Sequence, residues 1–169
     1  MKKTLKKIND LVKQGIITNY AIAGGMAQFY YIEPSVTYDL DLIVQVPGEE
    51  NTLNPLAKIY DWAAQNGYQP ESEHIIIEGI PVQFLLAYND LVKEALENSN
   101  KVSLYEEAAY ILGPEYLMAI MLQTGRLSDK ERLSKFLIED VYDKNKFFTI
   151  LERFNLLEVF KKFSGENNG

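Results

Sequence analysis

The spacing of apolar residues in the first half of the chain alternates between the periods of helices and strands. A 3.6-residue period predicts an amphipathic helix over residues 3–15. A short apolar run at 20–23 ends at two glycines, and a second helical segment follows over 26–33. Residues 38–46 are apolar and β-branched enough for a strand, although two aspartates interrupt them. The chain is therefore expected to begin as helix, strand, glycine turn, helix and strand.

A further helix and a hairpin follow in the same pattern. The apolar spacing predicts a helix over residues 55–66, which Gly67 ends. Two apolar, β-branched runs at 75–77 and 81–86 flank Glu78-Gly79, which predicts a hairpin turn. The first half of the chain thus mixes strands with helices.

The pattern changes after Asn89 and becomes mainly helical. A helix is expected around residues 91–97 and a short extended piece near 108–112, and Pro114 then opens a helix within its first turn. We expect a mixed α+β core over residues 1–90 and a mainly helical C-terminal region over residues 91–169 that packs on it.

Composition narrows the classes of function. The 169 residues are 47% hydrophobic, which is enough for a real core. The balance of 17 Lys and Arg against 24 Asp and Glu gives a net charge of −7, which disfavours broad nucleic-acid binding. With no cysteine and one histidine, metal chemistry would have to use carboxylates. No signal segment or membrane span is evident, so we expect a soluble cytoplasmic protein.

Two acids in the predicted strand are the first candidate site. Asp39 and Asp41 stand two residues apart, so in a strand their side chains share one face about 7 Å apart at the backbone. A Mg²⁺ ion would relieve their repulsion, because it prefers hard oxygen ligands. The alternative is that both acids keep an exposed strand end soluble.

The glycine turn is the second candidate. Gly24 and Gly25 lie between a strand and a helix, where backbone N–H groups can approach a phosphate. Tight-turn geometry alone would also explain two glycines.

These two motifs together resemble the nucleotidyltransferase superfamily, especially its AbiEii-like toxin branch. The similar segments are Ala23 to Ala27 and Thr37 to Leu42, followed by weaker similarity through 79–85, 114–119, 126–129 and 151–156. The resemblance implies a small mixed sheet flanked by helices with a C-terminal helical region. It also implies an NTP substrate and Mg²⁺ or Mn²⁺ as the cofactor.

The resemblance assigns roles to particular residues of this chain. It implies that Asp39 and Asp41 bind the catalytic metal. Gly24 and Gly25, with Met26 and Thr37, would bind the nucleotide. Gln83 falls where the family's third catalytic carboxylate is expected.

Four departures from the family pattern point to a degenerate site. Gln83 is a neutral amide, which can neither act as a base nor bind a metal with charge. Met26 replaces a hydroxyl that would contact phosphate, and Ser35 and Met121 replace two expected cations. Chemistry that depends on these groups should be impaired.

The sequence favours structural or solvent-exposed positions for the other charged residues. Glu73 and Glu78 are expected too far along the hairpin to replace the missing acid. Arg126 and Lys130 could bring positive charge to the cleft, or they could be solvated or paired on an exposed helix. His74 is expected to be a hairpin-strand residue with no catalytic role, because no second ligand or acid accompanies it at a telling spacing.

Three functions remain open from the sequence. The first is Mg²⁺-dependent transfer of a nucleoside monophosphate from an NTP to a hydroxyl acceptor. The second is a catalytically degenerate binding or regulatory protein with a protein partner, within a toxin–antitoxin or defence system. The third is a plain interaction scaffold. We expect Asp39 and Asp41 to line the main cleft with Gln83 facing them from a neighbouring strand.

Overall fold

The structure is a computed structural model that describes residues 1–32 and 39–168. Thr37 and Ser35 lie outside the described residues. Within them the helices are α1 (Lys2–Lys13), α2 (Gly24–Tyr31), α3 (Ala57–Gln65), α4 (Asp90–Glu97), α5 (Pro114–Thr124), α6 (Leu127–Glu139), α7 (Lys144–Arg153) and α8 (Leu157–Asn168), with a 3₁₀ turn at Glu49–Asn51. The strands are β1 (Asn19–Ala23), β2 (Leu40–Gln45), β3 (Pro70–Glu71), β4 (His74–Ile77), β5 (Ile80–Leu86), β6 (Asn100–Leu104) and β7 (Glu107–Ile111).

These strands form one mixed sheet in the order β3-β4-β5-β2-β1-β7-β6. The central strand β2 runs antiparallel to β1 and parallel to β5, and β1 runs parallel to β7. The outer pairs β3 with β4, β4 with β5 and β6 with β7 are antiparallel. The α+β class expected from the sequence, with a small mixed sheet and flanking helices, is confirmed.

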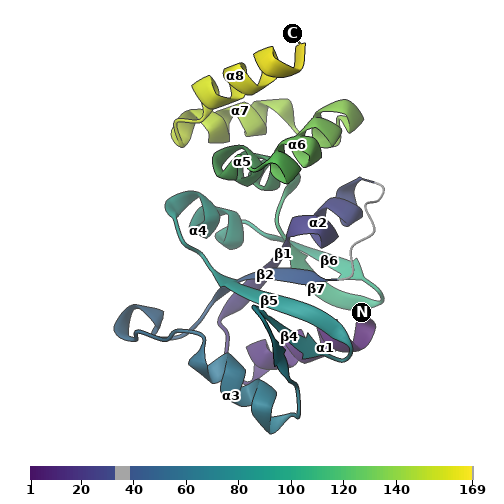
Figure 1. The fold of residues 1–169 in the computed structure, drawn as a ribbon, viewed down its shortest axis with the longest axis vertical. Coiled ribbons are helices and arrows are strands. Elements are labelled where there is room, and N and C mark those ends of the chain that lie inside the picture. The colour runs from purple at the N-terminus through teal and green to yellow at the C-terminus, as the bar shows by residue number, and fades with distance from the viewer. Residues whose placement is uncertain (33–38, 169) are drawn as a thin grey trace.

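The sheet continues past residue 90. The predicted extended piece near 108–112 is β7, and its partner β6 was not predicted. The backbone turns between them at Tyr105 and Glu106, which both have positive φ and neither of which is glycine, so the usual sign of a tight turn is missing. The helices α5 to α8 follow this hairpin and lie together at one end of the molecule (Figure 1).

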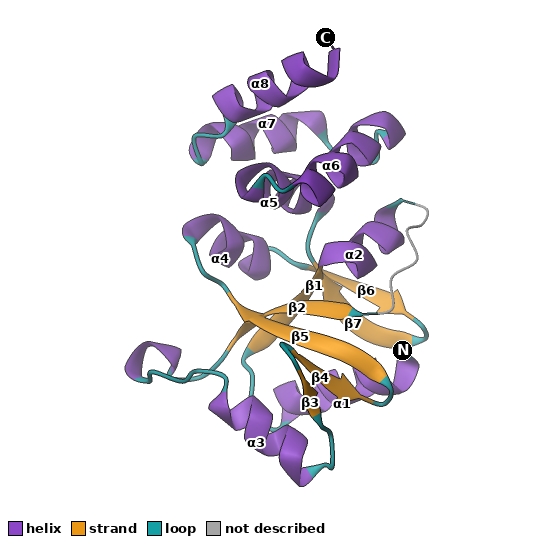
Figure 2. Ribbon diagram, in the orientation of Figure 1, coloured by secondary structure: helices purple, strands orange, loops and turns teal. Residues whose placement is uncertain are grey.

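The two faces of the sheet carry different helices. Figure 2 shows α1 and α3 on one side of the strands and α2 and α4 on the other, with α5 to α8 beyond them. Side chains alternate between faces along a strand, and the even positions of β2, Leu40, Leu42 and Val44, are fully buried. The odd positions therefore face α2, α4 and the C-terminal helices, and this is the face on which the candidate site lies.

Polar contacts join the C-terminal helices to the rest of the fold. The Arg153 guanidinium on α7 donates two hydrogen bonds to the carboxylate of Glu94 on α4, and the Tyr116 hydroxyl on α5 donates a third at 2.8 Å. On α5, Glu115 is buried; it accepts from the backbone N–H of Asp143 and lies 3.5 Å from the Lys146 ammonium. No helix among the described residues is both long and apolar enough to cross a membrane.

Candidate functional site

The candidate site is built where β2 begins, beside the turn from β1 into α2. The strand register places Asp41 opposite Ala23 of β1 on one side and opposite Gln83 of β5 on the other. Residues opposite each other in neighbouring strands point to the same face. The fold therefore brings together the glycine turn, the aspartate pair and Gln83, although these are far apart in the sequence.

A cavity of about 340 Å³ opens between this face of the sheet and the helices α4, α5 and α6. Gly24, Asp41 and Gln83 line it from the sheet side, and Met121, Arg126 and Arg132 line it from the helices. Asp39 is not among the lining residues, but one of its carboxylate oxygens lies within 4.8 Å of one of Asp41. Asp41 and Gln83 thus face the expected cleft directly, and Asp39 lies beside it.

Gly24 makes close contact with Asp41. Its φ is +59°, and a Cβ atom built on it would lie 2.3 Å from Oδ2 of Asp41. The helix α2 begins at Gly24, and among the described residues no side chain caps its first turn. Its first backbone N–H groups lack helical partners, as at every helix start, and they lie beside the cavity that Gly24 lines.

His74 joins the two aspartates, which the sequence did not predict. Its Nε2 atom lies 3.8 Å from Oδ2 of Asp39, and one potential ligand atom from each of Asp39, Asp41 and His74 lies within 4.8 Å of the other two. His74 is on a hairpin strand as expected, but two acids lie beside it, although none stands at a telling spacing from it in the sequence. The reason is strand pairing, because β4 runs beside β5 and brings a residue from the far side of the hairpin to β2.

Charges around Asp41 act in both directions. Burial raises the pKa of the Asp41 carboxyl, and the nearby charge of Asp39 raises it further. His74, Arg132 and Arg126 lower the same pKa, but to a smaller extent. The site therefore combines two acids that repel each other with cations from the C-terminal helices.

Two arginines, Arg126 and Arg132, line the cavity, and only Arg126 was predicted from the sequence as a candidate. Arg126 was considered as a cleft cation or as one half of an ion pair, and it is both: Nε lies 2.8 Å from Oδ2 of Asp129 and the side chain lines the cavity. Arg132 was missed, because on α6 it is one charged residue among several. Lys130 lines a different cavity.

The remaining predicted residues lie close by or elsewhere. Gly25 and Met26 are buried in α2, and Met121 is buried at the cavity wall where a cation was expected. Glu78 lies in the hairpin turn and accepts a 2.8 Å hydrogen bond from the Tyr68 hydroxyl. It therefore does not replace the missing acid.

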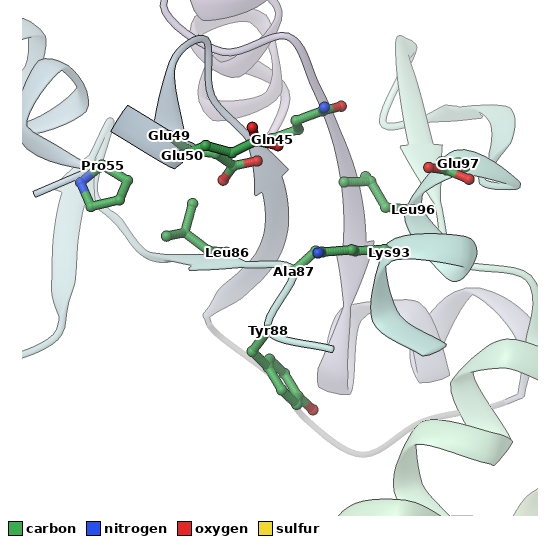
Figure 3. A pocket seen from close by; sticks show the side chains of 10 residues that line it. All are labelled: Gln45, Glu49, Glu50, Pro55, Leu86, Ala87, Tyr88, Lys93, Leu96 and Glu97. Atoms are coloured by element: carbon green, nitrogen blue, oxygen red, sulfur yellow. The ribbon is translucent and has the colours of Figure 1, made fainter. Parts of the chain in front are cut away.

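A second cavity, of about 510 Å³, lies further along the strands (Figure 3). Glu49, Glu50 and Glu97 line it together with Lys93, and Tyr88 lines both cavities. None of the residues singled out from the sequence as site residues lines this second cavity.

Comparison with known proteins gave matches among solved structures alone. No family model matches the chain, and no curated protein matches it. The solution structure of the antibiotic-resistance factor ANT(2'')-Ia matches with a TM-score of 0.56 at 12% identity, over 98% of this chain and 95% of that chain. The crystal structure of ANT(2'')-Ia in complex with adenylyl-2''-tobramycin matches with a TM-score of 0.52 at 14% identity, over 89% and 94%.

An antigenic nucleotidyltransferase-like protein from Paracoccidioides brasiliensis matches with a TM-score of 0.54 at 14% identity, over 78% of this chain and 72% of that chain. The chain has a nucleotidyltransferase-like fold. These identities are too low to carry more than the fold, because a fold hosts many functions and function is decided by the site. Within this nucleotidyltransferase-like fold, the groups that bear on function are Asp39, Asp41 and their neighbours.

Proposed function

We propose that the chain binds a nucleoside triphosphate with a divalent cation and transfers the nucleoside monophosphate to a hydroxyl acceptor. The observation that carries the proposal is the convergence of Asp39 and Asp41 beside the uncapped start of α2, at the mouth of a cavity. Carboxylates and a helix N-terminus are the groups that bind a metal-bound triphosphate.

The residues present fit a divalent cation. The cluster offers two carboxylates and an imidazole within 4.8 Å, and Asp41 is held against Gly24. Bringing such groups together costs stability unless a cation offsets their repulsion. A bound cation would stabilise the charge on the triphosphate and on the leaving pyrophosphate.

The roles of the other residues follow from their positions. The first N–H groups of α2 would hold phosphate oxygens, and Arg126 and Arg132 would contribute positive charge from the opposite wall. In the transfer, the acceptor oxygen bonds to the α-phosphorus, the bond to pyrophosphate breaks, and the hydroxyl proton must leave. Gln83 cannot accept that proton, so a carboxylate oxygen of the cluster would have to.

A second candidate is favoured by Gln83 itself. It stands directly opposite Asp41 in the strand register, at the point where the family resemblance expects a third acid. A chain that binds nucleotide there without transferring it would act as a binding or regulatory module. The similarity of its motifs to the AbiEii-like branch supports a place in a toxin–antitoxin or defence system, with a protein partner.

Thermal shift and calorimetry with each NTP, with and without Mg²⁺ or Mn²⁺, test nucleotide binding. A ligand at one hundred times its Kd stabilises the folded state by about 2.7 kcal/mol, which is roughly 5–10 °C in Tm for a chain of this size. We expect a metal-dependent rise that is lost in Asp41→Asn. Absence of a shift with every nucleotide would overturn transfer and nucleotide binding, and it would favour a degenerate module that acts through a protein partner.

Pyrophosphate release and label transfer from an α-labelled NTP then separate the two. Release that depends on an added hydroxyl acceptor supports transfer. Binding without release supports the regulatory module.

A further inference from the structure

His74 is the one histidine of the chain, and the fold brings it to the aspartate pair. Its imidazole is largely shielded from solvent, with 22% of the side chain exposed, whereas the Asp39 side chain is 49% exposed. The Nε2 atom of His74 lies 3.8 Å from Oδ2 of Asp39. This separation is longer than a hydrogen bond, and it leaves room for an ion between the two atoms.

Strand pairing explains how the imidazole arrives there. Ile75 of β4 pairs with Val82 of β5, so the next step of the antiparallel register brings His74 alongside Gln83. Gln83 is in turn opposite Asp41. The three side chains therefore follow one another across three adjacent strands on one face of the sheet. A charged or metal-binding group that is missing at Gln83 is supplied one strand further out.

The spacing of the three donors is close to that of ligands on one ion. Nitrogen and oxygen ligands lie about 2.0–2.2 Å from a transition-metal ion, so two ligands of one ion lie at most about 4.4 Å apart. Donor atoms already within 4.8 Å of one another reach that geometry by a small movement of side chains. Three protein ligands leave further positions open for phosphate oxygens.

We propose that Asp39, Asp41 and His74 together bind one first-row transition-metal ion, such as Mn²⁺ or Zn²⁺, in preference to Mg²⁺. The ligand set decides this preference. Mg²⁺ takes oxygen ligands and loses water reluctantly, whereas imidazole nitrogen suits the transition metals. The role of this metal in the reaction rests on the proposed function. The inference adds the third protein ligand, His74, and the class of metal ion.

The single histidine makes a direct test available. In untagged protein, the imidazole resonances observed by NMR come from His74 alone. We expect Zn²⁺ to shift these resonances and Mn²⁺ to broaden them at substoichiometric concentration, while Mg²⁺ at the same concentration leaves them unchanged. Imidazole resonances that respond to none of the transition metals would overturn the proposal.

Calorimetry on variants adds a quantitative test. His74→Gln should weaken Mn²⁺ and Zn²⁺ binding at least tenfold, a fall at the lower end of the roughly 10–100-fold seen when groups that support metal ligands are removed. His74→Glu gives an all-oxygen set, so it should improve Mg²⁺ binding relative to Mn²⁺. Glu73→Gln is the control, because it changes an exposed neighbour of His74 outside the cluster. Equal metal affinities in wild type and His74→Gln would refute the assignment.

Different results would refute the metal site and the proposed nucleotidyl transfer. Imidazole shifts with Zn²⁺ but no nucleotide-dependent stabilisation would refute the proposed function and support the metal site. Transfer supported by Mg²⁺ with unchanged imidazole resonances would refute the metal site and support the proposed function.

Discussion

Replacing Gly24 by alanine tests how tightly the glycine turn and the aspartate pair are coupled. Gly24 has φ of +59°, and the added Cβ would lie 2.3 Å from Oδ2 of Asp41 and 3.2 Å from its Cγ. Asp41 is held in place by strand pairing on both sides. The methyl group therefore has to displace the carboxylate or move the start of α2.

Two costs add up in this variant. A residue with a Cβ in the left-handed region costs roughly 1–2 kcal/mol. Forcing an extra carbon into an occupied space costs about 1–3 kcal/mol more. We expect Gly24→Ala to lower the free energy of unfolding by about 2–5 kcal/mol, and to weaken metal-dependent nucleotide binding because Asp41 is displaced.

A matched control separates the two costs. Gly67 has φ of +75°, and a Cβ added there would meet nothing within 4 Å. Gly67→Ala therefore carries the conformational cost alone. Urea unfolding of both variants, and of Gly24→Ala in an Asp41→Ala background, measures the difference. The reasoning fails if Gly24→Ala costs no more than Gly67→Ala, or if removing the Asp41 carboxylate recovers none of the difference.

Three other predictions concern charge and protonation. Replacing Asp39 and Asp41 together by asparagine should leave the stability of the metal-free protein unchanged or raise it by about 1 kcal/mol, because a repelling pair is removed; a large fall in Tm would mean that the acids are structural. Arg153 holds the pKa of Glu94 below its usual range, with help from the Tyr116 hydroxyl. The ionised carboxylate therefore stabilises the fold at every pH above the ordinary pKa of glutamate. This stability is lost as the pH falls through the lowered pKa. Glu94→Gln should therefore cost about 1 kcal/mol near neutral pH, less at high salt, and progressively less in acid, as followed by urea unfolding. Burial raises the pKa of Tyr31 from 10.0 to about 12. The stability that the neutral Tyr31 hydroxyl contributes should be complete below pH 10 and lost as the pH rises to about 12. Alkaline unfolding curves of Tyr31→Phe should lack this contribution of Tyr31.

Local patterns were sufficient to predict most of the sheet. The apolar run before Gly24, the interrupted strand at Asp39 and Asp41, and the hairpin around Glu78-Gly79 each carry a strand or turn signal of their own. Strand β6 lacks such a signal, because Asn100, Lys101 and Ser103 are polar and the strand lies at an edge of the sheet. An edge strand buries little, so its sequence is weakly constrained.

The site was predictable only where its residues are neighbours in sequence. Asp39 and Asp41 are two residues apart, and strand geometry alone predicted that they would lie together, although β2 begins only at Leu40. His74 and Arg132 reach the cluster through strand order and helix packing, which no local spacing encodes. For that reason a lone histidine on a hairpin strand and one arginine of a charged helix carried no functional signal in the sequence.

The position of His74 changes the interpretation of Gln83. From the sequence, a neutral amide at the expected third acid indicates a lost active site. In the fold, the same face carries the imidazole of His74 one strand further on, close to both aspartates. The Asp41 carboxylate, whose ionised form is disfavoured by burial and by the charge of Asp39, packs against a glycine in the left-handed region; such an arrangement costs folding stability and is typical of functional sites. The arrangement therefore favours a site with an altered ligand set over a site that has merely decayed, and the metal preference of His74 variants distinguishes the two.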